Sequence, residues 1–247
     1  MGRFTKRAKK KAGGKSGTPG PGVVVMPAAD QMWTLSVVAL HDLKTPPGTS
    51  LAMVRGGGTT GSKRDLAIKR RLPDSSREWF FFLDSDMTPE PKTLLRLLSL
   101  NAPIAGALCY SRIPPFTPIV ELLPGQETVD LRGGPFEVAS TGGAALLVRR
   151  EVLEALSPGP YFPYDRDQPG GEDGNFCKLA REAGFPILID PDVQVGHVAT
   201  IPVDQKVAIA MSGWDGGGVS TVKPGAMGRI VVGSRNEAPQ PAGVGSE

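Results

Sequence analysis

Two aspartates stand one residue apart at the end of an apolar run in "FFFLDSDMTPEP", residues 80 to 91. Open α/β sheets gather their ligands at the carboxyl ends of the strands. A spacing of two residues directs Asp84 and Asp86 to the same side of an extended segment. Hard divalent cations prefer such oxygen ligands, with substrate phosphates and waters as the others. The pair indicates a Mn²⁺ or Mg²⁺ site, and the structural alternative is an acidic loop that caps the next helix.

A second acidic pair and a histidine follow later in the chain. "GGEDGNF" (170–176) places Glu172 and Asp173 at the start of a predicted helix, where acids also favour the helix N-terminus. His197, one of two histidines in the chain, ends the predicted strand "VQVGHV" (193–198). A histidine in that place is either a metal ligand or a structural side chain.

A glycine-rich segment precedes the first acidic pair. "RGGGTTGSKRD" (55–65) lacks the spacing of a P-loop and of a dinucleotide-binding loop. It predicts a flexible loop, with a diphosphate contact through Lys63 or Arg64 as the alternative. It is also similar to the glycine-rich signature of sugar nucleotidylyltransferases, although that signature follows the first strand of the fold.

The elements that must position these residues alternate between strand and helix, as in a doubly wound sheet. We expect strands at residues 33–40, 78–84, 102–110, 185–190 and 193–198, a strand or helix at 49–54, an apolar strand opening the segment 144–156, and helices at 61–72, 91–100 and 174–184. This order predicts an α/β fold with a mostly parallel central sheet.

Length and composition fit one such domain. The 247 residues are 40% hydrophobic and 21% charged, which suits a single large α/β domain. No apolar run approaches the roughly 18 residues that would span a bilayer, and no signal peptide is expected. Cys109 and Cys177 lie in apolar contexts without paired spacing, so we expect reduced core thiols in a cytoplasmic protein.

The net charge of +3 conceals an uneven distribution. The first fifteen residues contain seven of the 28 basic residues and no acid, which leaves 21 basic against 25 acidic residues in the rest. We expect a disordered basic tail at 1–22, one domain at 23–232 and a disordered tail at 233–247. The basic tail suits either solubility or the binding of a polyanion such as nucleic acid.

Two enzyme classes place two aspartates at such a strand end. "FLDSDMT" matches the D-x-D-x-T string of phosphatases of the haloacid-dehalogenase type, in which Asp84 would be the nucleophile and Asp86 the general acid and base. That motif normally ends the first strand of its fold. Here a predicted strand and helix precede it, and no isolated lysine followed by an apolar strand that ends in paired acids appears downstream.

More of the chain resembles the nucleotide-sugar glycosyltransferases of the GT-A fold, in particular the family-2-like enzymes. "GSKRDLAIKRRL" followed by "REWFFFLDSDMTPEPKTLLRLL" resembles their nucleotide-binding half, which we place at about 33–110. "STGGAALLVRREVLEAL" and "GGEDGNFCKLAREAGFPILIDPDVQVGHV" resemble their acceptor half, at about 111–200. In the family, a mobile lid often follows the histidine, and residues 201–232 occupy that place.

The resemblance implies a role for each motif. Arg64 stands at the position of a family arginine that contacts the donor, whereas Asp65 replaces the usual asparagine and is not carried over. Asp86 would bind the cation directly, with His197 as a further ligand. Asp84 would contact the ribose, or the metal through water.

The acceptor half supplies the remaining roles. Asp173 would be the catalytic base of an inverting transferase, and Glu172 would orient the acceptor. Gly142 and Gly143 would let the backbone approach the donor sugar, although a plain turn explains them as well.

The sequence therefore predicts a metal-dependent hexosyltransferase that uses a nucleoside-diphosphate sugar, with UDP favoured over GDP. The tail favours nucleic acid with modified bases as the acceptor, as in viral enzymes of this general kind, and a protein, a small glycoside and a lipid carrier head group are the alternatives. A haloacid-dehalogenase-type phosphatase, a sugar nucleotidylyltransferase and a non-catalytic nucleic-acid-binding protein are the other hypotheses.

Overall fold

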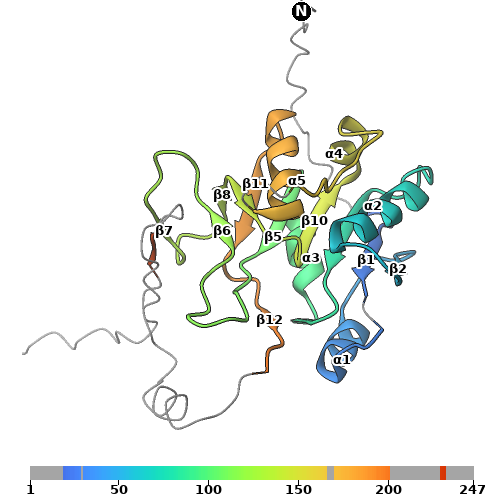
Figure 1. Ribbon diagram of the computed structural model, residues 1–247, viewed down its shortest axis with the longest axis horizontal. Helices are drawn as coiled ribbons and strands as arrows, with labels where there is room; N and C mark the ends of the chain where they lie inside the picture. Colours follow the sequence, from blue (N-terminus) through green and yellow to red (C-terminus); the bar gives the residue numbers. More distant parts are fainter. Residues whose placement is uncertain (1–18, 29, 166–169, 201–228, 232–247) are drawn as a thin grey trace, which may run out of the picture.

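A computed structural model describes residues 19–28, 30–165 and 170–200, and the backbone of 229–231 (Figure 1). Residues 1–18 of the predicted basic tail, the C-terminal tail and most of the predicted lid lie outside this description. Residues 19–22 precede the first strand and contact the sheet, because the Gly20 N–H donates to Glu78 and the indole N–H of Trp79 donates to the Gly20 carbonyl.

Helices and strands alternate along the described chain. The first half contains β1 (Val23–Pro27), α1 (Thr34–Asp42), β2 (Ser50–Val54), α2 (Thr60–Arg71), β3 (Trp79–Leu83), β4 (Met87–Pro89), α3 (Thr93–Ser99) and β5 (Ile104–Ala107). The second half contains β6 (Val120–Glu121), β7 (Thr128–Asp130), β8 (Phe136–Val138), β9 (Ser140–Thr141), β10 (Ala145–Arg149), α4 (Arg150–Ala155), α5 (Gly171–Glu182), β11 (Ile187–Asp190), β12 (Val195–His197) and β13 (Arg229–Val231).

Seven of these strands form the central sheet, in the order β2-β1-β3-β10-β5-β11-β8. Strands β2, β1, β3, β5 and β11 run in one direction, and β10 and β8 run against them. The expected α/β fold with a mostly parallel sheet is confirmed. The carboxyl ends of the parallel strands therefore lie at one edge, with the end of β3 near the middle of the sheet.

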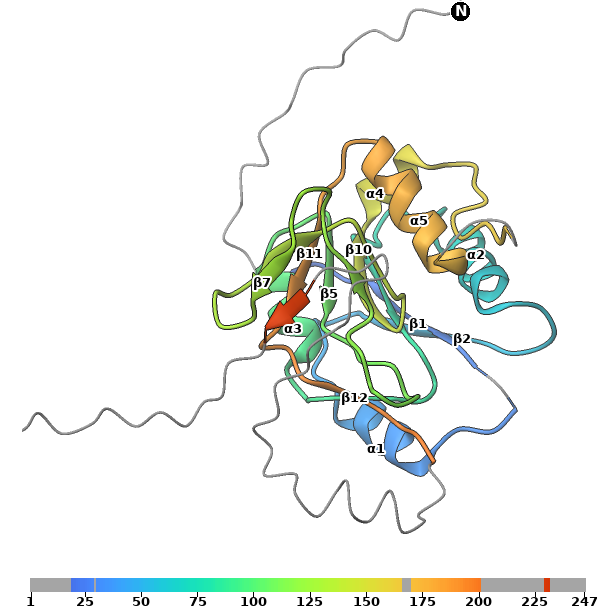
Figure 2. The same ribbon diagram turned by 60° about the vertical axis from the view of Figure 1, so that its left-hand side comes forward.

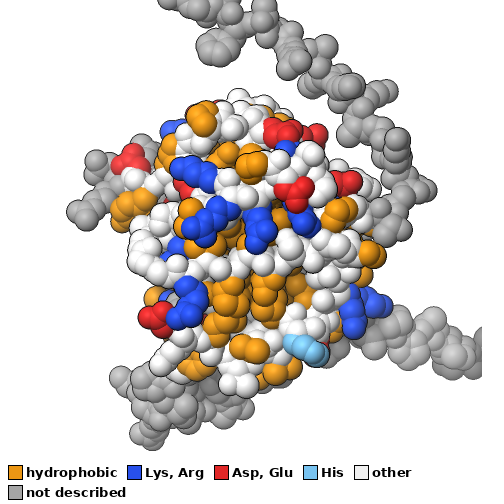
Figure 3. Space-filling view, turned by 90° about the vertical axis from the view of Figure 1, so that its right-hand side faces the viewer, with side chains coloured by type: hydrophobic (Ala, Val, Ile, Leu, Met, Phe, Trp, Pro, Cys, Tyr) orange, Lys and Arg blue, Asp and Glu red, His pale blue; other side chains and the backbone are white. Residues whose placement is uncertain are grey.

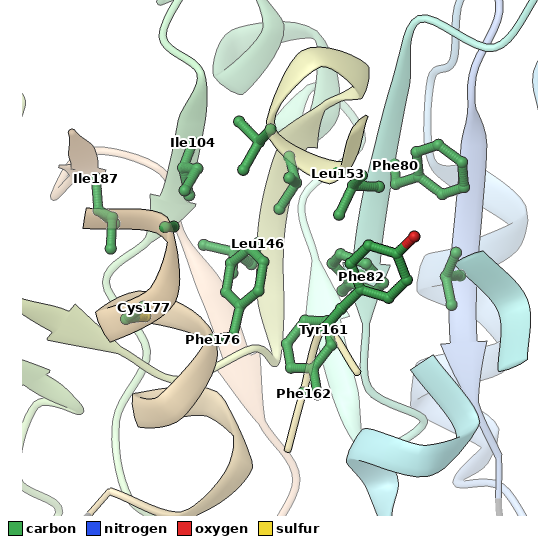
Figure 4. Close-up of a cluster of buried hydrophobic side chains, with 14 of the residues drawn as sticks. Phe80, Phe82, Ile104, Leu146, Leu153, Tyr161, Phe162, Phe176, Cys177 and Ile187 are labelled. Atoms are coloured by element: carbon green, nitrogen blue, oxygen red, sulfur yellow. The ribbon is translucent and has the colours of Figure 1, made fainter. Parts of the chain in front are cut away.

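Helices cover both faces of the sheet (Figures 1 and 2). Alternate residues of β3 enter two separate cores, which explains its uninterrupted apolar run. Phe80 and Phe82 pack with residues of α2, α4 and α5 in the core of Figure 4, whereas Trp79, Phe81 and Leu83 pack with residues of α3 on the other face. Cys109 and Cys177 are buried and unpaired, as expected of core thiols.

The predicted strand at 33–40 is wrong, because these residues form most of helix α1. The strand position at the start of the domain belongs to β1, which the sequence analysis did not assign. All five residues of β1 are buried, whereas Leu35, Val37 and Val38 of α1 are exposed. Hydrophobic periodicity cannot tell a strand from a helix in a short apolar run. Residues 23–27 and 33–40 are distinguished only because the first segment pairs with β2 and β3.

The remaining predicted elements agree with the structure apart from their ends. The segment at 49–54 is the edge strand β2, which pairs in parallel with β1. Apolar side chains gather on the side of the molecule that Figure 3 shows. Leu51 and Met53 of β2 are among the exposed large hydrophobic residues. Within the described part of the chain, the helices lack the length and apolar content needed to cross a bilayer.

Candidate active site

The two aspartates after β3 lie at the carboxyl edge of the sheet. The Asp84 N–H donates to the carbonyl of Ala144, just before β10, at 3.0 Å, which holds the end of β3 beside that strand. Strand β4 begins directly after Asp86 and pairs with β12, so that Met87 lies opposite His197. The capping alternative fails, because the N-cap of α3 is Lys92, without a side-chain hydrogen bond.

Arg64 joins the two acidic motifs. Its Nη2 lies 2.7 Å from Asp84 Oδ1 and its Nη1 lies 2.5 Å from Asp173 Oδ1. The side chain is only 1% exposed, and its guanidinium lies 5.3 Å from the ring centroid of Phe162. Burial by itself lowers the pKa of Arg64, but the charges of Asp84 and Asp173 outweigh it and the pKa is raised. The structure therefore fixes a permanent cation between the end of β3 and the first turn of α5.

The pKa of Asp84 is raised by its surroundings. Burial raises its pKa above the ordinary value, and the neighbouring Asp173 and Asp86 raise it further, whereas Arg64 opposes the shift. Arg64 therefore does not offset the combined effect of burial and the two neighbouring carboxylates on Asp84. An additional cation at this edge would relieve it.

The acids of "GGEDGNF" contact elements other than their own helix. Helix α5 begins at Gly171, and both acids lie in its first turn. Glu172 Oε1 accepts the Gly61 N–H at 3.0 Å, in the first turn of α2. Asp173 Oδ2 accepts the Gly143 N–H at 2.9 Å. The motif therefore connects α5 to α2 and to the segment before β10, whereas the N-cap of α5 is Gly170, without a side-chain hydrogen bond.

Gly143 has a packing reason in this structure. A Cβ at this position would lie 2.8 Å from Arg64 Cζ and 2.8 Å from Asp173 Oδ1, so it would collide with both partners of the Arg64–Asp173 ion pair. A Cβ at Gly142 would meet only Ile119 Cγ2, at 3.2 Å, and Asp173 Oδ2, at 4.0 Å. Approach to a donor sugar remains a prediction for both glycines.

Gly143→Ala should lower the free energy of unfolding by about 1 to 3 kcal/mol, the usual cost of overpacking. Gly142→Ala is the matched control, because it adds the same methyl group one residue away and should cost less. Thermal and urea unfolding of both variants measure the difference. Equal losses in the two variants would contradict the packing argument.

His197 is oriented towards Asp86. Its Nδ1 lies 2.9 Å from the Tyr110 carbonyl, and its Nε2 lies 3.2 Å from Asp86 Oδ2. A carbonyl only accepts, so Nδ1 carries a proton. In the neutral ring, Nε2 then presents a lone pair towards a carboxylate oxygen, an arrangement that a shared cation stabilises. Asp86 and His197 thus have the donor atoms and the orientation to hold Mn²⁺ or Mg²⁺.

A substrate would have to complete that coordination. Among the residues that the structure describes, no three His, Cys, Asp or Glu side chains cluster closely enough to hold a metal ion. Two protein ligands with phosphate oxygens and waters are a common arrangement for magnesium in phosphate chemistry. Asp86 and His197 could therefore hold a cation only together with further ligands of that kind.

Arg112 escaped the sequence analysis, and Asp65 and Lys63 have contacts that it did not predict. Arg112 Nη1 lies 2.8 Å from Asp86 Oδ2, although nothing in "YSRIPPF" distinguishes this arginine. Asp65 Oδ1 accepts the N–H groups of Tyr161 and Phe162 at 3.1 and 2.9 Å. Asp65, which stands where the resembled family has asparagine, thus holds the backbone of Phe162, whose ring lies against Arg64. Lys63 donates to the Ala28 carbonyl, beside β1.

A cavity of about 680 Å³ lies away from these residues, against α3 and the end of β11. It contains none of the predicted site residues. Its most buried acid, Asp190, is paired with Arg96 through contacts of 2.7 and 3.2 Å. That pair ties α3 to β11, which is a structural function.

No protein-family model matches the chain, and no curated protein matches it. Among solved structures, A197 from STIV aligns with a TM-score of 0.51 at 14% identity, over 72% of this chain and 85% of that one. TarS from S. aureus aligns with a TM-score of 0.47 at 13% identity, over 72% of this chain and 36% of TarS. TarS 1-349 in complex with UDP-GlcNAc aligns with a TM-score of 0.47 at 12% identity, over 75% of this chain and 60% of that one. The likeness to A197 and the seven-stranded sheet show a single Rossmann-like α/β domain.

Proposed function

We propose that the chain is a glycosyltransferase of the GT-A type, which transfers one sugar from a nucleoside-diphosphate sugar to an acceptor hydroxyl. The observation that carries this proposal is the position of Arg64 between Asp84 and Asp173. It brings the D-x-D motif at the strand end together with the G-E-D motif at the start of α5. A transferase needs a donor site and a base side by side, and the end of β3 and the first turn of α5 offer candidates for both.

On the donor side, Asp86 and His197 would hold the cation, and Asp84 would contact the ribose. The cation would neutralise the charge that develops on the departing diphosphate. Arg64 holds the Asp84 carboxylate through Oδ1, and the Asp84 side chain is 26% exposed. A ribose hydroxyl could therefore reach the carboxylate from the exposed side.

Asp173 would act as the base. Arg64 and the Gly143 N–H fix its carboxylate, and the side chain is 28% exposed. An ionised carboxylate has about four lone-pair sites, so two hydrogen bonds leave room for an acceptor hydroxyl. The acceptor oxygen would bond to the anomeric carbon as the bond from that carbon to the diphosphate breaks, and Asp173 would take the hydroxyl proton.

A thermal-shift panel tests the donor class. UDP, GDP, UDP-glucose, UDP-GlcNAc and GDP-mannose are each added with and without Mn²⁺. We expect one nucleotide to raise the melting temperature only with Mn²⁺, because ligands that bind the folded state stabilise it. A panel without any shift would count against the proposal. Phosphate release from a phosphomonoester would favour the phosphatase instead.

Asp173→Asn tests the base. We expect the transfer rate to fall by about two to four orders of magnitude while donor binding is retained, because asparagine keeps the shape but cannot take a proton. Glu172→Gln is the comparison for a positioning residue and should lower the rate less, because Glu172 would only orient the acceptor and its contact with Gly61 lies at the neighbouring helix. A rate that is equally low in both variants would remove the distinction between base and positioning residue.

For the acceptor, we propose nucleic acid, because seven basic residues lie among the first fifteen. The test is deletion of residues 1–18, which spares the contacts of Gly20 with Glu78 and Trp79. DNA retention should weaken and lose much of its salt dependence. Unchanged retention would leave a protein acceptor as the better hypothesis.

A further inference from the structure

Arg112 occupies the carboxylate oxygen that the proposed function assigns to the cation. Its Nη1 lies 2.8 Å from Asp86 Oδ2, and His197 Nε2 faces the same oxygen at 3.2 Å. We propose that Arg112 is an exchangeable counter-ion. It neutralises Asp86 while the donor site is empty, leaves Asp86 when a divalent cation binds, and then contacts the diphosphate of the donor. This inference rests on the proposed function.

The backbone that carries Arg112 is held in place. Tyr110 and Pro118 form a bridge, and the Ser111 N–H donates to the Thr117 carbonyl at 2.8 Å. The same Tyr110 contributes the carbonyl that orients His197. One loop, residues 110–118, therefore fixes a metal ligand and presents the arginine that competes with the metal.

The Arg112 side chain, in contrast, is able to turn. It is 56% exposed, whereas Arg64 is 1% exposed and engaged by two carboxylates. Exposed side chains change rotamer within nanoseconds, and a single exposed ion pair contributes at most about 1 kcal/mol. Of these two arginines, only Arg112 can exchange one anionic partner for another without uncovering a buried charge.

The charges at the site explain why an exchange is needed. Three aspartates, Asp84, Asp86 and Asp173, face two arginines, Arg64 and Arg112, and Glu172 adds a further negative charge that acts on Arg64, so negative charge is in excess. An anionic diphosphate is repelled by such a site. A divalent cation on Asp86 reverses the local charge and releases the guanidinium, whose planar fork matches phosphate oxygens. The cation and the arginine would then contact the diphosphate together.

Arg112→Gln separates this exchange from a structural role, because two affinities should move in opposite directions. For Mn²⁺ alone, affinity should rise roughly threefold to tenfold, since the competing charge is gone. For UDP at saturating Mn²⁺, affinity should fall by about tenfold or more, since a charged hydrogen bond to phosphate is lost. Titration calorimetry on the full chain measures both. Arg132→Gln is the matched control, because Arg132 is 64% exposed, pairs with Asp130 and has no contact with Asp86.

Each outcome decides between the alternatives. Weaker binding of both Mn²⁺ and UDP in Arg112→Gln would mean that the arginine only supports Asp86, and would overturn the exchange. Unchanged affinities would overturn it while leaving the proposed function intact. UDP binding that depends on Arg112 but never on Mn²⁺ would make the arginine a permanent substitute for the cation, which also overturns it. A wild-type chain that binds neither ligand would overturn both this inference and the proposed function.

Discussion

Replacing Asp86 with asparagine should lower the transfer rate and the affinity for Mn²⁺ by at least about a hundredfold. Even supporting residues around a metal cost 10-fold to 100-fold when they are lost, and Asp86 would be a direct ligand. Asparagine keeps an oxygen for Arg112 and for the loop geometry, so the loss isolates the charge. The Mn²⁺ dependence of transfer and the binding of Mn²⁺ measured by titration calorimetry are the readouts.

Two controls make this result interpretable. Asp130→Asn removes an exposed carboxylate that is paired with Arg132, and it should leave the transfer rate and the affinity for Mn²⁺ unchanged. The melting temperature of Asp86→Asn should stay within a few degrees of the wild type, because the ion pair it loses involves a largely exposed arginine. Full Mn²⁺-dependent activity in Asp86→Asn would exclude this aspartate as the ligand.

Arg64→Met should lower the free energy of unfolding by about 3 kcal/mol, because it removes the shared partner of two carboxylates. Breaking a fully buried pair costs about 3 to 5 kcal/mol, and the lower figure applies since Asp84 and Asp173 are each about a quarter exposed. For a chain of this size the melting temperature should fall by about 10 °C. Urea unfolding followed by circular dichroism measures the change.

The stability loss in Arg64→Met should also depend on pH. Asp84 already has a raised pKa in the folded chain, through burial and through Asp173 and Asp86, and Arg64 is the group that opposes the rise. Without Arg64 the folded pKa rises further above the unfolded value of about 3.9. The folded state then binds the extra proton as pH falls, so the variant recovers stability relative to wild type on acidification from pH 7 towards pH 4.

A second substitution tests the cause of the loss. Adding Asp84→Asn to Arg64→Met removes one uncompensated carboxylate, so the double variant should be more stable than Arg64→Met at pH 7 and should show less dependence on pH. Additive losses from the two substitutions would mean that Arg64 stabilises the fold through its packing on Phe162 and not through charge.

The sequence specified most of the elements of this domain. The buried run of β3 is recognisable because both faces of a central strand are covered, and the acids after it mark the carboxyl edge. Helix α2 was predicted from Leu66, Ile68 and Leu72 among basic residues, although Leu66 proves to be exposed. The first strand shows the limit: the prediction placed it at 33–40, which is α1, and did not assign β1, because two short apolar runs compete for one strand position and only sheet pairing decides between them.

The residue types at the candidate site were also determined by the sequence alone: two aspartates at a strand end, an acidic pair before a helix and one histidine late in the chain. Their pairing was decided only by the tertiary structure. Arg64 between Asp84 and Asp173, Glu172 on the first turn of α2, and Arg112 on Asp86 are contacts between segments far apart in the chain. The reason is physical: strand pairing and the packing of α2 against α5 set these distances, and neither is encoded in local spacing.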